Sequence, residues 1–574
     1  MPEEDATVSF PRGIVPAGSP RPAGSLSGEK ALAGQQAFTG QEALAAALMA
    51  AQAPGAKASA TGLVPVVPAP DLIPDGLAVR DAVLSGRFFA AAHRAEADAL
   101  AAFVAGAPHP LTAWFGRSRA VALARDADAL RCALDRDIAA IDALLSAQVD
   151  AILHAPRLRK LEGSWRGLNW LVEPIDPSNR IKVKVLSAGW TEVARDLERA
   201  AEFDQSHLFR KIYEEEFGSP GGEPYGLLVV DHEVRHRPSA AAPTDDVTVL
   251  KLLASIAAAA FTPTVLAAAP ELLELDSFAD LSGVQDPSAA MRSADYLRWR
   301  GLFTQEDIRF LAVTLPRVLA RPPWDDDDLR AEGWRYTEYA PDAACRVWSS
   351  AGYAFAATVV RAFANFTWPA DVRGLETDRR AGGLVDGLVP EPFGTDRGDV
   401  WVRPSLEIVL TDRQERSLVD AGLMPLSAIP FAEEAVFGAV RSLQIPQQYL
   451  GPNAHASGAN ARLSAQINTL LCVARFAHYV KMLGRDMVGA FRTAEEIEDQ
   501  LQRWISRYVN SNINSGGEAR ARYPLVAGQV SVQERPGKPG VYGCVIHMQP
   551  HFQLDDVSAQ FRLVTDIAAP GTAR

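Results

Sequence analysis

The most chemically suggestive residues of this chain are two histidines four positions apart with a glutamate between them. They belong to the segment His232-Glu233-Val234-Arg235-His236, which matches the zinc motif HExxH. In zinc hydrolases this motif lies on a helix, where both imidazoles reach one metal ion and the glutamate activates a water molecule. A zinc-dependent hydrolase that uses His232, Glu233 and His236 is therefore one hypothesis for the function.

The elements that would have to position this motif argue against that chemistry. The apolar run Leu227 to Val230 predicts a strand directly before the motif, and Pro238 and Pro243 follow it. A helix cannot run through that context, because proline lacks the backbone N–H that a helix interior needs. No third ligand follows at a suitable spacing. On a strand or loop we expect two exposed histidines without a metal.

Three further segments contain residue types that occur in active sites, but none has the required spacing. His547 and His551 are separated by Pro550 within an alternating pattern that predicts a strand. The acidic run Asp325 to Asp328 lacks the spaced acids and central glycine of a calcium loop. The glycines of Gly218 to Gly222 precede a strand, whereas a phosphate-binding loop follows one. No GxSxG nucleophile elbow is present. The sequence thus predicts no catalytic, cofactor or metal site.

The composition describes a large, acidic, folded protein. Its 574 residues are 48% hydrophobic, which is enough for roughly three or four domain cores. The chain has 70 Asp and Glu against 57 Lys and Arg, a net charge of −13 that disfavours nucleic-acid binding through many phosphate contacts. Four scattered cysteines suit a reducing compartment, and the acidic N-terminus does not resemble a signal peptide. We predict a cytoplasmic protein.

One uncharged segment, Leu252 to Pro270, has the length of a membrane span. It is rich in alanine and is interrupted by Pro263, so we predict a buried helix followed by a strand and no membrane insertion.

The first part of the sequence predicts a disordered tail followed by helices. Residues 1–75 are biased toward Ala, Gly, Pro and Ser, a composition that buries too little apolar surface to fold and predicts a disordered tail. Short helices are predicted at Leu77 to Ser85 and Ala91 to Val104. Apolar residues at three- and four-residue steps then predict one long helix from Asp126 to Leu161.

The middle of the chain alternates between strands and helices. Strands are predicted at Ile181 to Leu186, Tyr225 to Val230 and Thr264 to Ala268, with a helix at Asp246 to Ala260 between the last two. That order implies parallel strands joined by a right-handed crossover. Further core elements are predicted at Arg309 to Leu315, Ala351 to Asn365 and Leu406 to Thr411.

The C-terminal part predicts helices and then an antiparallel sheet. Leu463 to Val509 has a helical pattern, and strands are predicted at Val526 to Gln533, Val541 to Met548 and Ser558 to Val564. The fold class is therefore mixed α/β: a helical N-terminal region, a central α/β core and a C-terminal antiparallel segment. We divide the chain at 1–75, 76–165, 166–460 and 461–574.

Several segments in the same order resemble the large sheath subunit of type VI secretion systems, the TssC (VipB) family. The first, Leu161-Glu162-Gly163-Ser164-Trp165-Arg166-Gly167-Leu168, is close to a signature of that family. The others are Gly221-Gly222-Glu223-Pro224-Tyr225-Gly226, Tyr296 to Arg300, Phe310 to Arg317, Arg475 to Lys481 and Pro550-His551-Phe552. The similarity covers about Gly76 to Asp566.

The resemblance implies a structural polymer subunit and no enzyme. Members of that family pair with a small sheath subunit, TssB (VipA), and the pairs stack on a baseplate into a helical tube around an inner tube of Hcp rings. The sheath contracts and is then dismantled by the ATPase ClpV. A sheath of another phage-tail-like contractile machine stays open as an alternative.

The resemblance also implies two kinds of contact. Neighbouring sheath subunits are tied together by added strands, for which the C-terminal hairpin is a candidate platform. The sequence does not say which strands pair. ClpV grips a short helix near the N-terminus, and the similar segment here begins at Gly76. Leu77, Asp81 and Leu84 share one helical face, with Val83 beside Leu84, which makes them the candidate contact.

Overall fold

The computed structural model describes most of the chain after the N-terminal tail. The described residues are 78–86, 94–219, 221–326, 333–376, 380–394, 400–430, 432–446, 458, 461–488, 493–512, 515–534 and 542–551. The tail at 1–75, Leu77, the turn at 536–540 and the strand predicted at Ser558 to Val564 lie outside them. The described chain forms two compact units, divided between residues 147 and 148.

The smaller unit is helical, as predicted. It contains α2 (Val79–Leu84), α3 (Arg94–Val104), α4 (Pro110–Phe115), α5 (Arg117–Leu123) and most of α6 (Ala127–Leu153). Its small core is built on Phe115, Ala120 and Ala133.

The single helix predicted from Asp126 to Leu161 is wrong, because the chain breaks into two helices. α6 ends at Leu153, and α7 (Pro156–Val172) begins at a proline. The apolar spacing continues across the break, but Pro156 has no N–H to continue the ladder of α6 and suits the first turn of a new helix. No described helix alone is long and apolar enough to cross a bilayer; α6 and α7 together meet those criteria by length and composition only, with a 68° bend between them.

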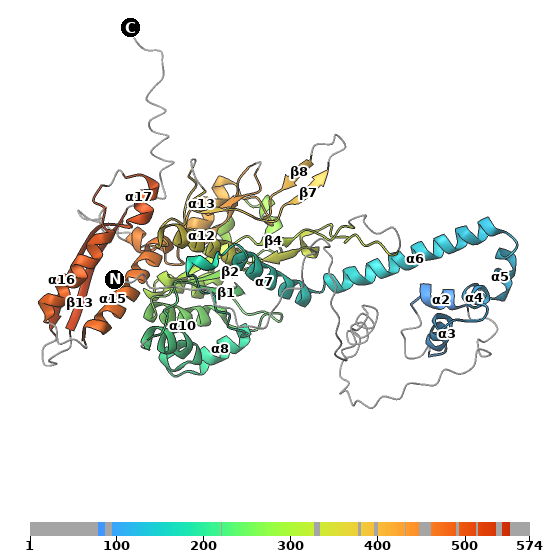
Figure 1. Ribbon diagram of the computed structural model, residues 1–574, viewed down its shortest axis with the longest axis horizontal. Coiled ribbons are helices and arrows are strands. Elements are labelled where there is room, and N and C mark those ends of the chain that lie inside the picture. The colour runs from blue at the N-terminus through green and yellow to red at the C-terminus, as the bar shows by residue number, and fades with distance from the viewer. Residues whose placement is uncertain are drawn as a thin grey trace, which may run out of the picture. The chain divides into compact units, whose positions relative to one another are not determined.

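The larger unit is built around a parallel sheet in the order β1-β2-β3-β9, formed by Leu228–Val234, Thr264–Ala268, Leu311–Leu315 and Met424–Pro425. The crossover helix α10 (Asp246–Ala259) joins β1 to β2, as the sequence predicts. Figure 1 shows α10 and α12 (Ala351–Phe366) on opposite sides of these strands. Helices cover both faces, and β2 and β3 are fully buried, whereas β1 carries the polar residues Asp231, His232 and Glu233 in its second half.

Two predicted strands are wrong. Ile181 to Leu186 has no ladder partner in the described chain; its lysines Lys182 and Lys184 instead form ion pairs with Glu223 and Glu216. Leu406 to Thr411 makes only an isolated bridge, from Leu406 to Val318, and the place beside β3 is taken by β9. Both segments have strand-like composition, but pairing depends on neighbours that spacing does not reveal.

Shorter elements surround the sheet. The helices are α8 (Trp190–Arg199), α9 (His207–Phe209), a π-helical turn (Arg210–Gly218), α11 (Leu297–Leu302) and α13 (Asp412–Asp420). The strand pairs and small sheet are β4 (Val318–Arg321) with β5 (Val347–Ser349), β7 (Glu391–Gly394) with β8 (Val400–Arg403), and β10 (Ser427–Ala428), β11 (Ala435–Val436) and β6 (Leu384–Val385). Tyr296 and Trp299 are fully buried in the core of this unit.

The C-terminal part has the helices and antiparallel hairpin that the sequence predicts. α15 (Ile467–Val488), α16 (Ala494–Ile505) and α17 (Gly517–Arg522) precede β12 (Leu525–Glu534) and β13 (Tyr542–Pro550). A second core lies beneath the hairpin, where Ile497, Leu501 and Ile505 of α16 pack with Val530 and Val532 of β12.

Candidate functional site

Helix α7 contains Leu161 to Leu168, the segment that resembles the family signature. The backbone of this helix lies very close to the backbone of β5, with almost no side chain between them. A Cβ atom on Gly163 would overlap the carbonyl oxygen of Trp348, and one on Gly167 would overlap the hydroxyl of Ser349. Glycine is needed at both positions because only hydrogen fits between the helix and the strand. The two glycines therefore set the distance between α7 and β5.

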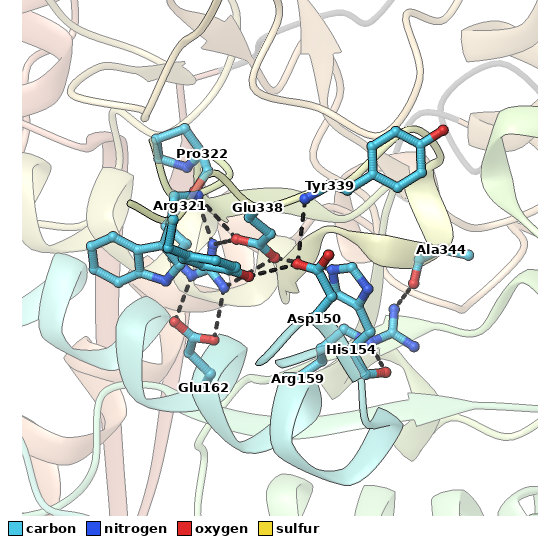
Figure 2. Close-up of polar contacts among 11 residues, drawn as sticks. Asp150, His154, Arg159, Glu162, Arg321, Pro322, Glu338, Tyr339 and Ala344 are labelled. Carbon is cyan, nitrogen blue, oxygen red and sulfur yellow. Dashed lines mark hydrogen bonds and ion pairs between the residues drawn. The ribbon is translucent and has the colours of Figure 1, made fainter. Parts of the chain in front are cut away.

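A buried ion cluster fixes the same helix from its side (Figure 2). Arg321, at the end of β4, donates from Nε to Glu162 Oε1 at 2.7 Å and from Nη1 to Glu338 Oε2 at 2.5 Å. The side chains of Arg321 and Glu338 are 5% and 1% exposed. Burial opposes ionisation of Glu338, but the hydrogen bonds and charge of Arg321 outweigh it and hold the pKa of Glu338 below its ordinary value.

The cluster extends to the bend between α6 and α7. His154 Nε2 lies 3.1 Å from Glu338 Oε1, and the hydroxyl of Tyr336 donates to Asp150 at 2.6 Å. Arg159 donates to the carbonyl oxygens of His154 and Ala344, as Figure 2 shows. These contacts tie α6 and α7 to β4 and to the segment that contains Tyr336 and Glu338, so the network anchors the two helices.

The outer face of α7 is apolar. Leu161 and Trp165 are 56% and 53% exposed, and Leu158, Leu168 and Val172 continue the same stripe at three- and four-residue steps. The inward face is the one that carries the glycines. An exposed tryptophan in an apolar stripe is a common feature of protein–protein interfaces. The sequence pattern showed these residues but not which face they occupy.

The two histidines of the HEVRH segment lie in a strand and its exit, not on a helix. His232 is in β1, stacks on Trp190 with ring centroids 4.1 Å apart, and lies 3.2 Å from Asp246. His236 is 5% exposed and stacks on Tyr296. The prediction of two exposed histidines is wrong, because both rings pack against aromatic side chains that are distant in sequence.

The glutamate of the segment is also engaged. Glu233 accepts two hydrogen bonds from Arg317, at 2.8 and 2.9 Å. Burial opposes its ionisation, yet the guanidinium of Arg317 keeps the pKa of Glu233 below its ordinary value. Glu233 is thus paired with a permanent cation. Within the described residues no group of three or more His, Cys, Asp or Glu side chains is placed to hold a metal ion.

The remaining histidine and aspartate candidates lie apart. His547 is exposed on β13, whereas Nε2 of His551 is buried without a hydrogen-bond partner in the described structure. Asp325 accepts a hydrogen bond from Thr337, and Asp327 and Asp328 are outside the described residues. Among the described residues, none of these side chains joins His232 in a group that could hold a metal ion.

Helix α2 holds three of the four residues of the candidate ATPase contact, Asp81, Val83 and Leu84. Val79 and Ala82 are buried in the helical unit, and Arg80 and Trp114 both donate to Asp137, at 2.8 and 3.0 Å. Asp81 is exposed, and Val83 and Leu84 are half-buried. By helical geometry Asp81 and Leu84 lie on the side opposite Val79 and Ala82. Leu77 is outside the described residues.

Comparisons with known proteins give a consistent result. The family model described as EvpB/VC_A0108, tail sheath N-terminal domain, matches residues 135–444, and the one described as EvpB/VC_A0108, tail sheath gpW/gp25-like domain, matches 456–567. The curated Type VI secretion system sheath protein TssC1 of Pseudomonas aeruginosa is 36% identical over 445 residues, which cover 77% of this chain and 86% of that protein.

A solved structure, the cryo-EM structure of the anti-feeding prophage (AFP) baseplate, contains a chain with 11% identity and a TM-score of 0.29. The match covers 54% of this chain and 64% of that chain. The descriptions of both family models and of TssC1 are those of sheath proteins, and none of them mentions a hydrolase. The two family models together match most of the larger unit, including its C-terminal helices and hairpin. Because of these matches and the 36% identity to TssC1, this chain belongs to the TssC (VipB) family of type VI secretion sheath proteins.

Proposed function

We propose that this chain pairs with a small sheath subunit, TssB, and that the pairs polymerise on a baseplate into a cytoplasmic tube around Hcp. The protein then acts by assembly and contraction, without an enzymatic reaction. The observation that carries the proposal is the outward stripe of α7: Leu161 and Trp165 belong to the family-like segment, yet the chain's own fold leaves them in solvent. A partner subunit would remove them from water.

Co-expression with the adjacent small-subunit gene is expected to give hollow tubes in negative-stain micrographs. Changing Leu161 and Trp165 together to Asp should reduce recovery of the small subunit with this chain by about tenfold or more, because charged side chains at a desolvated contact cost several kcal/mol. The matched control is Leu297→Asp, which alters a leucine that is 70% exposed on α11. A wild-type chain that stays monomeric and ignores the small subunit would overturn the proposal.

The proposal includes dismantling of contracted tubes by ClpV through α2. Asp81 and Leu84 lie on the outward side of that helix, which suits an amphipathic helix that enters a groove on a partner. The double change Leu77→Asp and Leu84→Asp should leave tubes intact but abolish ClpV binding to them in a sedimentation assay. Normal disassembly of tubes of the double variant would place the recognition helix elsewhere. A dependence on ClpV also distinguishes a type VI sheath from that of another contractile machine.

A further inference from the structure

The long helix α6 presents an apolar stripe to solvent within the smaller unit. Leu134 and Ile138 are 36% and 55% exposed, and the half-buried Ile141 and Leu145 continue the stripe at three- and four-residue steps. The packing of the unit covers a different face of α6, the one with Ala133 and the Asp137 that Trp114 and Arg80 bind. The stripe is therefore a surface that the described fold leaves open.

The sequence before α2 contains a segment that fits this stripe. Thr39 and Glu42 have the spacing of a capping box, and Leu44 and Leu48 lie four apart in an alanine-rich run that ends at Ala51. On a helix the two leucines share one face, between small alanine side chains that let a neighbouring helix come close. As a helix, residues 41–51 would be about 16 Å long, which is also the length of the stripe from Leu134 to Leu145.

The charges at the stripe also suit this segment. By helical geometry Arg131, Asp135 and Asp142 lie along one border of the stripe, so that border carries both signs and favours no strongly charged partner. The run from Ala43 to Ala51 has no charged residue. It would lie on the stripe without removing a charge of its own from water.

The connection to α2 keeps the segment near α6. Residues 52–78 link it to Val79, the first residue of α2, which belongs to the same helical unit. A flexible chain of that length has a mean end-to-end distance of about 30 Å, which is comparable with the length of α6. Such a linker gives an effective concentration in the millimolar range. The segment can therefore occupy the stripe at an affinity that is too weak for a separate molecule.

We propose that residues 41–51 fold as a helix on the stripe of α6 and shield it from a second copy of the chain. Burial of Leu44, Leu48, Leu134 and Ile138 offsets the conformational entropy that the segment loses. The tail lies before both matched sheath models, and the contact is made within one chain. The inference goes beyond the proposed function and does not depend on assembly into tubes.

Hydrogen exchange of the full-length chain tests the contact. After correction for intrinsic rates, the amides of residues 44–51 should exchange about tenfold or more slowly than those of residues 58–63, because docking forms helical hydrogen bonds. Ile138→Asp should abolish this protection. Ala139→Asp, an exposed change on α6 outside the stripe, should preserve it. Fast exchange of residues 44–51 in the wild type, or protection that survives Ile138→Asp, would overturn the proposal.

Sedimentation velocity of full-length variants tests the shielding. Leu48→Asp should release the segment and uncover the stripe, so that the chain forms larger species, and adding Ile138→Asp should restore the wild-type profile. Ala46→Asp is the matched control, because on a helix it lies on the side opposite Leu44 and Leu48. Identical profiles for Leu48→Asp and Ala46→Asp would contradict shielding. A wild type that dimerises while residues 44–51 exchange fast would identify a second copy as the occupant instead.

Discussion

Replacing Arg321 with methionine is expected to lower the free energy of unfolding by about 3–5 kcal/mol, because it leaves the buried carboxylate of Glu338 without its cation. The side chain of Glu338 is 1% exposed, so water cannot replace the guanidinium there, whereas Glu162 keeps a second partner, Arg166, whose Nε lies 2.7 Å from its Oε1. Chemical denaturation followed by far-UV circular dichroism gives the difference. Arg298→Met, which removes a partly exposed ion pair with Asp245, should cost no more than about 1 kcal/mol.

The pH dependence gives this prediction a second readout. In the wild type the pKa values of Glu162 and Glu338 are below the ordinary value of 4.5, so their stabilisation is present above that pH and is lost as the pH falls through the folded pKa. Without Arg321 the pKa of Glu338 should rise, because burial opposes its ionisation and the partner that lowers its pKa most is gone. The penalty in the variant should then shrink as the pH falls from 7 toward 5. A difference that is equal at pH 7 and pH 5 would contradict the assignment.

Changing Gly163 to alanine is expected to destabilise the larger unit by about 1–3 kcal/mol, because the added methyl group overlaps the backbone of Trp348. The loss should appear as a lower midpoint of thermal unfolding, even though alanine alone favours helix by about 0.5–1 kcal/mol.

Gly301→Ala is the matched control for this change. Gly301 also lies in a helix, α11, but no atom lies within 4 Å of the position that a Cβ atom would take there, so the same substitution should be neutral or stabilising. Equal midpoints for the two variants would show that α7 can move away from β5 at little cost.

The parts of the fold that follow from local pattern were predicted well. Thr264 to Ala268 is a strand in which every residue is buried, as its short apolar run predicts. Ala351 to Phe366 is a helix, as its apolar spacing predicts. His478 of α15 is 2% exposed, and its Nε2 lies 2.9 Å from the carbonyl oxygen of Ala260. Burial lowers its pKa to about 4.

The candidate site could not be predicted to the same extent. Glu162 and Arg321 are 159 positions apart, and nothing local to either residue indicates the other. His236 is buried by Tyr296, which comes from a different element. The break before Pro156 did have a local signal, the proline itself, which the continuing apolar spacing obscured. The site is thus formed by contacts between residues that are far apart in the sequence. The residue pattern of a single segment does not reveal such contacts.

The two glycines of α7 also have a mechanical consequence. A helix that rests on its neighbour through side chains can yield, because the side chains rotate and slide. Here the backbone of α7 touches the backbone of β5 at Gly163, with no rotatable bond between them. A force applied from outside to the indole of Trp165 would therefore pass to Trp348 and Ser349 with little compliance. In a tube that shortens, such a stiff joint would let each subunit turn as one piece and transmit the motion to the next.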